Sequence, residues 1–99
     1  MNIKIKTLGF TPRQMLINFV YKKIGKLYQF YDKIITGEVL LSTEKSEGNE
    51  NKLCDVRLII PGNDLLARAQ CKTFEESIDQ TVGVLIKQIE KRKNRNIAY

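Results

Sequence analysis

The chain has 99 residues, a length that suits one domain and is too short for two. Apolar residues make up 42% and charged residues 28% of it, an ordinary globular composition that excludes a disordered or fibrous protein. Lys and Arg number 17 against 11 Asp and Glu, so the net charge is +6. In so small a domain this excess favours an anionic partner, nucleic acid ahead of an acidic protein or a membrane surface.

The sequence offers little that could support catalysis or metal binding. It contains no histidine, so the usual general base and the usual nitrogen ligand of a metal are both missing. Cys54 and Cys71 belong to no CxxC pair and predict neither a metal site nor a disulfide framework. No stretch has the length and hydrophobicity of a signal peptide or a membrane span. We therefore expect a cytoplasmic, non-enzymatic domain that uses no cofactor, metal, membrane or small-molecule substrate.

The first third of the chain predicts a strand followed by a helix. Residues 2–8 alternate isoleucines with Lys4 and Lys6, a period of two that is typical of a strand with one buried face. In residues 11–14, Thr11 can cap a helix, with proline in the next position and Gln14 completing a capping box. Apolar residues then recur at helical spacing, at Leu16, Phe19, Val20, Ile24 and Leu27, and at Tyr31 if the helix extends so far.

Three further strands are predicted by a return to period two. From Ile35, the residues Ile35, Val39 and Leu41 are expected on one buried face. Residues 44–51 are polar and aperiodic and predict a loop. Two more strands bury alternate residues on either side of a predicted four-residue turn at 61–64: Cys54, Val56, Leu58 and Ile60, then Leu65, Ala67, Ala69 and Cys71. That turn places Ile60 opposite Leu65, and hence Cys54 opposite Cys71.

A second helix completes the predicted fold. Residues 73–76 form another capping box. The helix is predicted to extend to about residue 93, which leaves residues 94–99 as a frayed tail. Its apolar stripe consists of Phe74, Ile78, Val82, Leu85 and Ile89. The order β-α-β-β-β-α gives a parallel first pair and an antiparallel meander within one domain over residues 1–99. Both helices must cover the same face of the four-stranded sheet, which predicts a two-layer α+β sandwich.

Positive charge is concentrated on the two helices. Residues 12–33 and residues 87–99 each carry a net charge of +4. One interpretation is a solvated surface whose basic end complements the helix dipole; two basic helices on one side of a sheet instead favour a surface that follows phosphates. For the aromatic residues 28–31, core closure is favoured over base stacking. The cysteines are expected to be buried apolar residues, and Glu75, Glu76 and Asp79 to complement the helix N-terminus.

Particular strings also resemble a known family. Residues 23–32, KIGKLYQFYD, fit the pattern K-x-x-K-L-x-x-[FY]-[FY]-D, and TFEESID at 73–79 followed by QIEKRK at 88–93 is similar to that family's second helix. Leu65-Leu66-Ala67 fits its fourth strand. Over about residues 2–95 the chain resembles the short ribosome hibernation promoting factors and ribosome-associated inhibitors of the sigma-54 modulation protein family.

The resemblance implies a fold related to double-stranded-RNA-binding domains and a partner, the small ribosomal subunit with its rRNA. Such factors occupy the mRNA and tRNA channel, block translation sterically and stabilise inactive ribosomes during slow growth or stress. Because the chain stops at Tyr99, without the C-terminal domain of long members, we expect a monomer when free. Matching positions give Lys23 and Lys26 in the first helix and Lys87, Lys91, Arg92 and Lys93 in the second as RNA-binding residues; electrostatics adds Lys22, Arg68 and Lys72.

Two other binding functions remain open at this point. One is a free-standing module for duplex RNA, which would bind isolated RNA as well as it binds small subunits. The other is a protein-interaction adaptor that uses the open sheet face around Leu40, Ile59 and Leu66, whose binding would persist at high salt.

Overall fold

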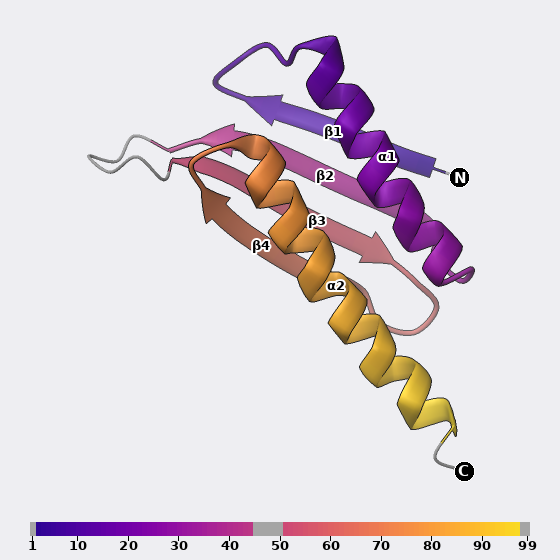
Figure 1. Ribbon diagram of the computed structural model, residues 1–99. Coiled ribbons are helices and arrows are strands. Elements are labelled where there is room, and N and C mark those ends of the chain that lie inside the picture. Colours follow the sequence, from indigo (N-terminus) through magenta and orange to yellow (C-terminus); the bar gives the residue numbers. More distant parts are fainter. Residues whose placement is uncertain (1, 45–50, 98–99) are drawn as a thin grey trace.

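A computed structural model describes residues 2–44 and 51–97 of the chain (Figure 1). The elements follow the predicted order: β1 (Asn2–Leu8), α1 (Gln14–Phe30), β2 (Thr36–Thr43), β3 (Lys52–Ile59), β4 (Leu65–Cys71) and α2 (Phe74–Ile97). The predicted loop falls largely on residues 45–50, outside the described part of the chain. At its base, the Glu44 amide donates to the Asn51 carbonyl over 2.9 Å.

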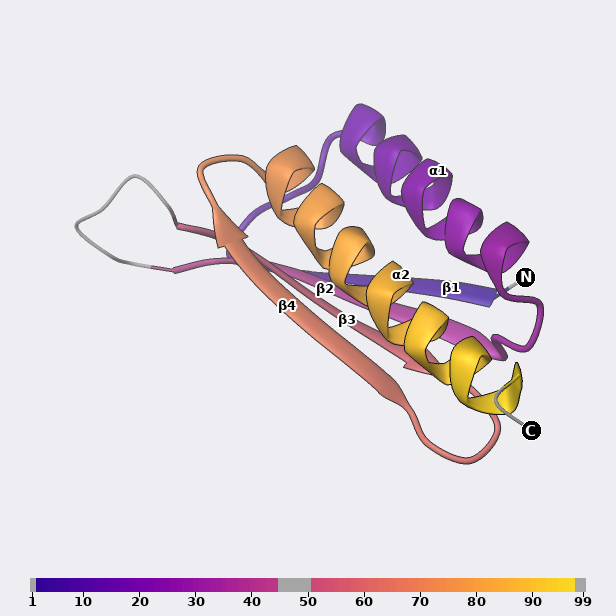
Figure 2. The ribbon, with the colours of Figure 1, turned by 60° about the horizontal axis from the view of Figure 1, so that its bottom comes forward.

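The four strands form one sheet in the order β1-β2-β3-β4. β1 is parallel to β2, whereas β2–β3 and β3–β4 are antiparallel. Both helices lie side by side on one face of this sheet and leave the other face uncovered (Figures 1 and 2). The two-layer α+β sandwich is therefore confirmed.

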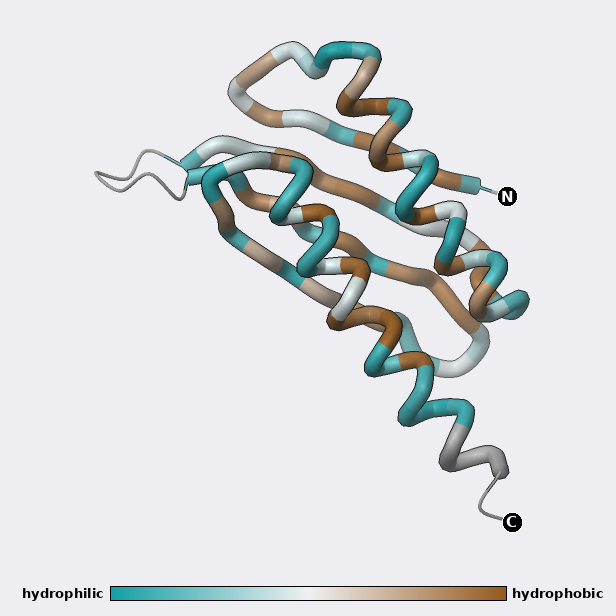
Figure 3. Tube along the Cα trace, in the orientation of Figure 1, coloured by the Kyte–Doolittle hydropathy of each residue, from teal (hydrophilic) through white to brown (hydrophobic). Residues whose placement is uncertain are grey.

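The core lies between the sheet and the helices, as the alternation predicts. Hydrophobic positions recur along the strands and helices with polar ones between them (Figure 3). Tyr31 and Ile60 are buried as expected. The remaining core residues come from both layers: Val20, Ile24 and Leu27 of α1, Val39 and Leu41 of β2, Cys54, Val56 and Leu58 of β3, and Ile78, Leu85 and Ile89 of α2.

α2 is held on β3 by two buried hydroxyl groups. Ser77 Oγ donates to the Lys52 carbonyl over 2.6 Å, and Thr81 Oγ1 donates to the Cys54 carbonyl over 3.5 Å. Upstream, the Glu76 amide donates to Thr73 Oγ1 over 3.1 Å, which confirms the predicted N-cap. The helix continues to Ile97, beyond its predicted end near residue 93, and residues 98–99 lie outside the described part.

The predicted cap of α1 is wrong. α1 begins at Gln14, and its N-cap is Arg13, which has extended backbone angles and no side-chain cap hydrogen bond. Upstream, the Phe10 ring stacks on Phe74 with 4.6 Å between centroids, which holds this segment against the start of α2. Thr11 therefore precedes the helix and does not cap it.

Ile35 is not on the buried face of β2. Its side chain is 55% exposed, whereas Ile34 is buried. β2 begins only at Thr36, so the alternation does not reach back to residue 35. Instead, the segment after α1 brings Tyr31 and Ile34 into the core.

The register of β3 with β4 differs from the prediction by two residues. Leu58 pairs with Leu65, so Cys54 lies opposite Ala69 and Cys71 opposite Lys52. The connection is longer than a four-residue turn and passes through Gly62 at φ +96°, a conformation that favours glycine. A two-residue shift keeps every side chain on its face, and both cysteines are accordingly buried, with free thiols.

Candidate nucleic-acid interface

Four lysines point outward from the helix layer. Each lies two residues from a buried core residue: Lys22 and Lys26 on either side of Ile24, and Lys87 and Lys91 on either side of Ile89. Since successive helix residues turn by about 100°, a two-residue step places these lysines away from the sheet. All four are exposed. We call Lys22, Lys26, Lys87 and Lys91 the lysine face.

The lysine face has two parallel rows. Within each helix the two lysines are four residues apart, which corresponds to about 6 Å along the axis. The helices that carry them lie side by side (Figures 1 and 2). Among the described residues, no carboxylate forms an ion pair with any of the four. Their charge is available to an external anion.

Lys23, which the sequence predicts as an RNA-binding residue, instead makes contacts within the protein. Its Nζ lies 3.0 Å from Asp79 Oδ1 of α2 and 5.3 Å from the centre of the Phe19 ring. The pair joins the two helices. Sequence reasoning missed this role because the partner is 56 residues away, and we find no signal in the sequence that links the two positions.

Arg92 and Lys93 also act within the domain. Arg92 Nη2 donates to the Pro61 carbonyl over 2.9 Å. Lys93 Nζ donates to the Phe30 carbonyl over 2.6 Å and lies 4.3 Å from the centre of that residue's ring. Lys93 thus supplies a donor and a positive charge at the C-terminal end of α1, where both are favourable.

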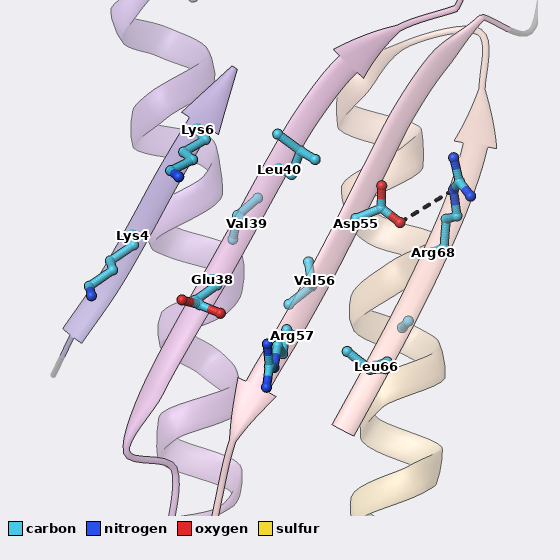
Figure 4. A pocket seen from close by; sticks show the side chains of 11 residues that line it. Lys4, Lys6, Glu38, Val39, Leu40, Asp55, Val56, Arg57, Leu66 and Arg68 are labelled. Atoms are coloured by element: carbon cyan, nitrogen blue, oxygen red, sulfur yellow. Dashed lines mark ion pairs between the residues drawn. The ribbon is translucent and has the colours of Figure 1, made fainter. Parts of the chain in front are cut away.

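The last two predicted residues lie away from the lysine face. Arg68 points from the uncovered sheet face (Figure 4), with its Nε 3.3 Å from Asp55 Oδ1. Lys72 is exposed just before α2, at the opposite end of that helix from Lys91. The structure therefore brings together four of the nine residues, commits three to the fold and separates two.

The aromatic residues within 28–31 pack in or against the core, as predicted. Tyr31 is buried, and Phe30 packs under Lys93. The Tyr28 hydroxyl donates to the Asn2 carbonyl over 2.5 Å. Burial raises the pKa of Tyr28, although backbone hydrogen bonds with Gly37 and Asn2 act in the opposite direction.

Within residues 2–44 and 51–97, no group of three or more Cys, Asp or Glu side chains is arranged to hold a metal ion. No helix of the described part is long and apolar enough to cross a membrane.

Known proteins resemble this chain in sequence and in fold. The sequence is 28% identical over 95 residues to a ribosome hibernation promoting factor from Klebsiella oxytoca, covering 96% of this chain and 94% of that one. The fold is similar to a ribosomal subunit interface protein from Coxiella burnetii (TM-score 0.84, 21% identity, 95% and 99% of the two chains). It is also similar to the N-terminal domain of Protein Y from Thermus thermophilus (TM-score 0.78, 21% identity, 92% and 98%). Residues 3–97 match the family model described as Sigma 54 modulation protein / S30EA ribosomal protein, and the chain belongs to that family.

Proposed function

We propose that this chain is a cytoplasmic ribosome hibernation factor that binds the small ribosomal subunit through the lysine face. Its partner is the rRNA that lines the mRNA and tRNA channel. By occupying that channel the folded domain excludes both RNAs and keeps the ribosome inactive. It acts as a monomer and without a catalytic group.

One observation carries this proposal: two rows of exposed lysines, unpaired among the described residues, project from neighbouring helices. Lysines that neutralise phosphates release condensed counterions, which supplies affinity without reading sequence. Membership of a family whose curated relatives are named ribosome hibernation promoting factors directs this chemistry to the ribosome.

The remaining predicted residues have supporting roles. Lys23, through Asp79, and Lys93, through the Phe30 carbonyl, hold the two helices at a fixed spacing. Arg92 fixes the 61–64 connection beside α2 through the Pro61 carbonyl. We place Lys72 at the periphery of the RNA contact, whereas Arg68, on the uncovered sheet face and paired with Asp55, lies outside it. Specificity then follows from the fit between a rigid domain and the shape of its site.

The proposal is tested by cosedimentation of the purified chain with small subunits in increasing potassium chloride. Four lysine–phosphate contacts predict that the logarithm of the binding constant falls with the logarithm of salt concentration with a slope of about −3. Subunits loaded with mRNA and tRNA should bind less of the chain, and isolated RNA duplex should bind more weakly than subunits. Salt-independent binding, or equal binding to loaded and empty subunits, contradicts the proposal.

A further inference from the structure

The uncovered face of the sheet contains a groove that the helix-based function does not use. It has a volume of about 600 Å³ and spans all four strands (Figure 4). Strand pairing arranges its outward side chains in two rows. One row runs Lys4, Glu38, Arg57, Leu66, and the other runs Lys6, Leu40, Asp55, Arg68.

The charges on the β3–β4 side of the groove are satisfied within the protein. Arg57 donates through Nε and Nη2 to Asp64 Oδ2, over 2.7 and 2.5 Å. Arg68 pairs with Asp55. Since these guanidinium groups are already bound to carboxylates, this half of the groove offers a ligand little net charge.

On the β1 side, two cations remain available. Lys4 and Lys6 are exposed, and neither forms an ion pair within the described residues. Their side chains leave the same face of one strand about 6.6 Å apart. The groove thus has one cationic edge, formed by Lys4 and Lys6.

Exposed leucine occupies the rest of the groove. Leu66 of β4 is 63% exposed on the sheet face that no helix covers (Figure 4). Leu40 of β2 is half-buried beside Lys6. Together they offer apolar surface on β2 and β4.

We propose that this groove binds an acidic amphipathic helix of a partner protein. A helix with two glutamates at i and i+4 presents its carboxylates about 6 Å apart, which matches the spacing of Lys4 and Lys6. Its adjacent apolar stripe covers Leu40 and Leu66, in the manner of helix-in-groove recognition. The surface is opposite the lysine face, so both can be occupied together.

Charge and chemistry disfavour two other occupants. An RNA backbone would bring a phosphate against Glu38 in the middle of the groove, and the described residues that line the groove include no aromatic side chain on which bases could stack. A second copy of this chain carries a net charge of +6, and its basic helices would repel Lys4 and Lys6.

The test uses isotope-labelled full-length chain and a synthetic helical peptide of about eighteen residues, with a leucine stripe and glutamates at i and i+4 along one edge. Its matched control carries lysines in place of those glutamates. Amide chemical shifts locate binding, and titration measures affinity. We expect the glutamate peptide to shift amides of all four strands of the sheet. Affinity should fall about tenfold or more in Lys4→Gln/Lys6→Gln and in Leu66→Ser, but not in Lys22→Gln/Lys87→Gln.

Several results would overturn the proposal. Equal binding of the lysine peptide would remove the role of the cationic edge, and shifts confined to α1 and α2 would place the peptide on the wrong surface. Tighter binding of an oligouridylate to the sheet face would assign the groove to RNA. Self-association that covers the same amides would assign it to a second copy. None of these outcomes alters binding of small subunits through the lysine face.

Discussion

Two lysines near the end of α2 show that a residue's partner, not its type, decides its role. Lys91 and Lys93 are two positions apart and therefore point in different directions. Lys93 donates to the Phe30 carbonyl, whereas Lys91 is exposed and forms no ion pair within the described residues. One stabilises the fold, and the charge of the other is available to an external anion.

Replacing Lys93 should therefore affect stability first. We expect Lys93→Ala to lower the free energy of unfolding by about 1 kcal/mol, because the C-terminal end of α1 loses a charged donor. Lys87→Ala is the matched control, since Lys87 makes no such contact with the described residues. It should leave stability nearly unchanged and weaken cosedimentation with small subunits. Urea denaturation measures the first effect; equal stability of the two variants would refute the assignment of Lys93.

The buried thiol of Cys54 predicts a loss of stability in alkali. Burial raises its pKa to about 12, whereas the pKa of a cysteine in an unfolded chain is about 8.5. Between these values the unfolded chain releases the proton and the folded chain retains it, so the free energy of unfolding falls as pH rises. Urea denaturation from pH 8 upward should show a smaller decline in Cys54→Ala than in the wild type. Parallel declines would mean that Cys54 is not the group responsible.

At the level of elements, much of the fold can be predicted because burial imposes a period. The apolar stripe of α2 and the alternation in β1, β3 and β4 lie where the sequence places them. The β3–β4 register could not be obtained in this way, because a shift of two residues leaves Cys54 and Cys71 on the same face. The start of α1 was equally hidden, because the segment just before it packs through Phe10 against Phe74, a residue distant in sequence.

The core position of Leu85 can be tested by truncation. Its side chain is fully buried between α2 and the sheet. Leu85→Ala should therefore cost about 2–5 kcal/mol through lost burial and the cavity left behind. Thermal and urea unfolding measure the loss. An unchanged free energy of unfolding would mean that Leu85 does not lie on the buried face of α2.

The two threonines ahead of the helices form a matched pair for capping. Thr73 accepts a hydrogen bond from the Glu76 amide, so Thr73→Ala should lower stability by about 1 kcal/mol. Thr11 lies before the N-cap of α1 and makes no such bond within the described part of the chain, so Thr11→Ala should have little effect. Urea denaturation of both variants decides the matter. A larger loss of stability in Thr11→Ala than in Thr73→Ala would mean that Thr11 does cap α1, as the sequence predicts.

At the scale of the whole molecule, the sequence predicts where positive charge is concentrated but not which cations remain available. The helical pattern places Lys22, Lys26, Lys87 and Lys91 away from the core. The partners of Lys23 and Lys93 lie on the other helix, and those contacts exist only after folding. The result is a domain with a lysine face on one side and a groove with a cationic edge on the other.

The central claim is that the lysine face binds the small subunit, and it is tested most directly by removing its four charges. The variant Lys22→Gln, Lys26→Gln, Lys87→Gln, Lys91→Gln is compared with Lys4→Gln, Lys6→Gln, Arg13→Gln, Lys33→Gln, which loses the same charge from other exposed positions. Both should fold, as circular dichroism can verify. In cosedimentation at fixed salt, we expect the first variant to lose affinity about a hundredfold or more and the second to bind nearly as the wild type does. Equal affinity of the two variants for small subunits would contradict the account.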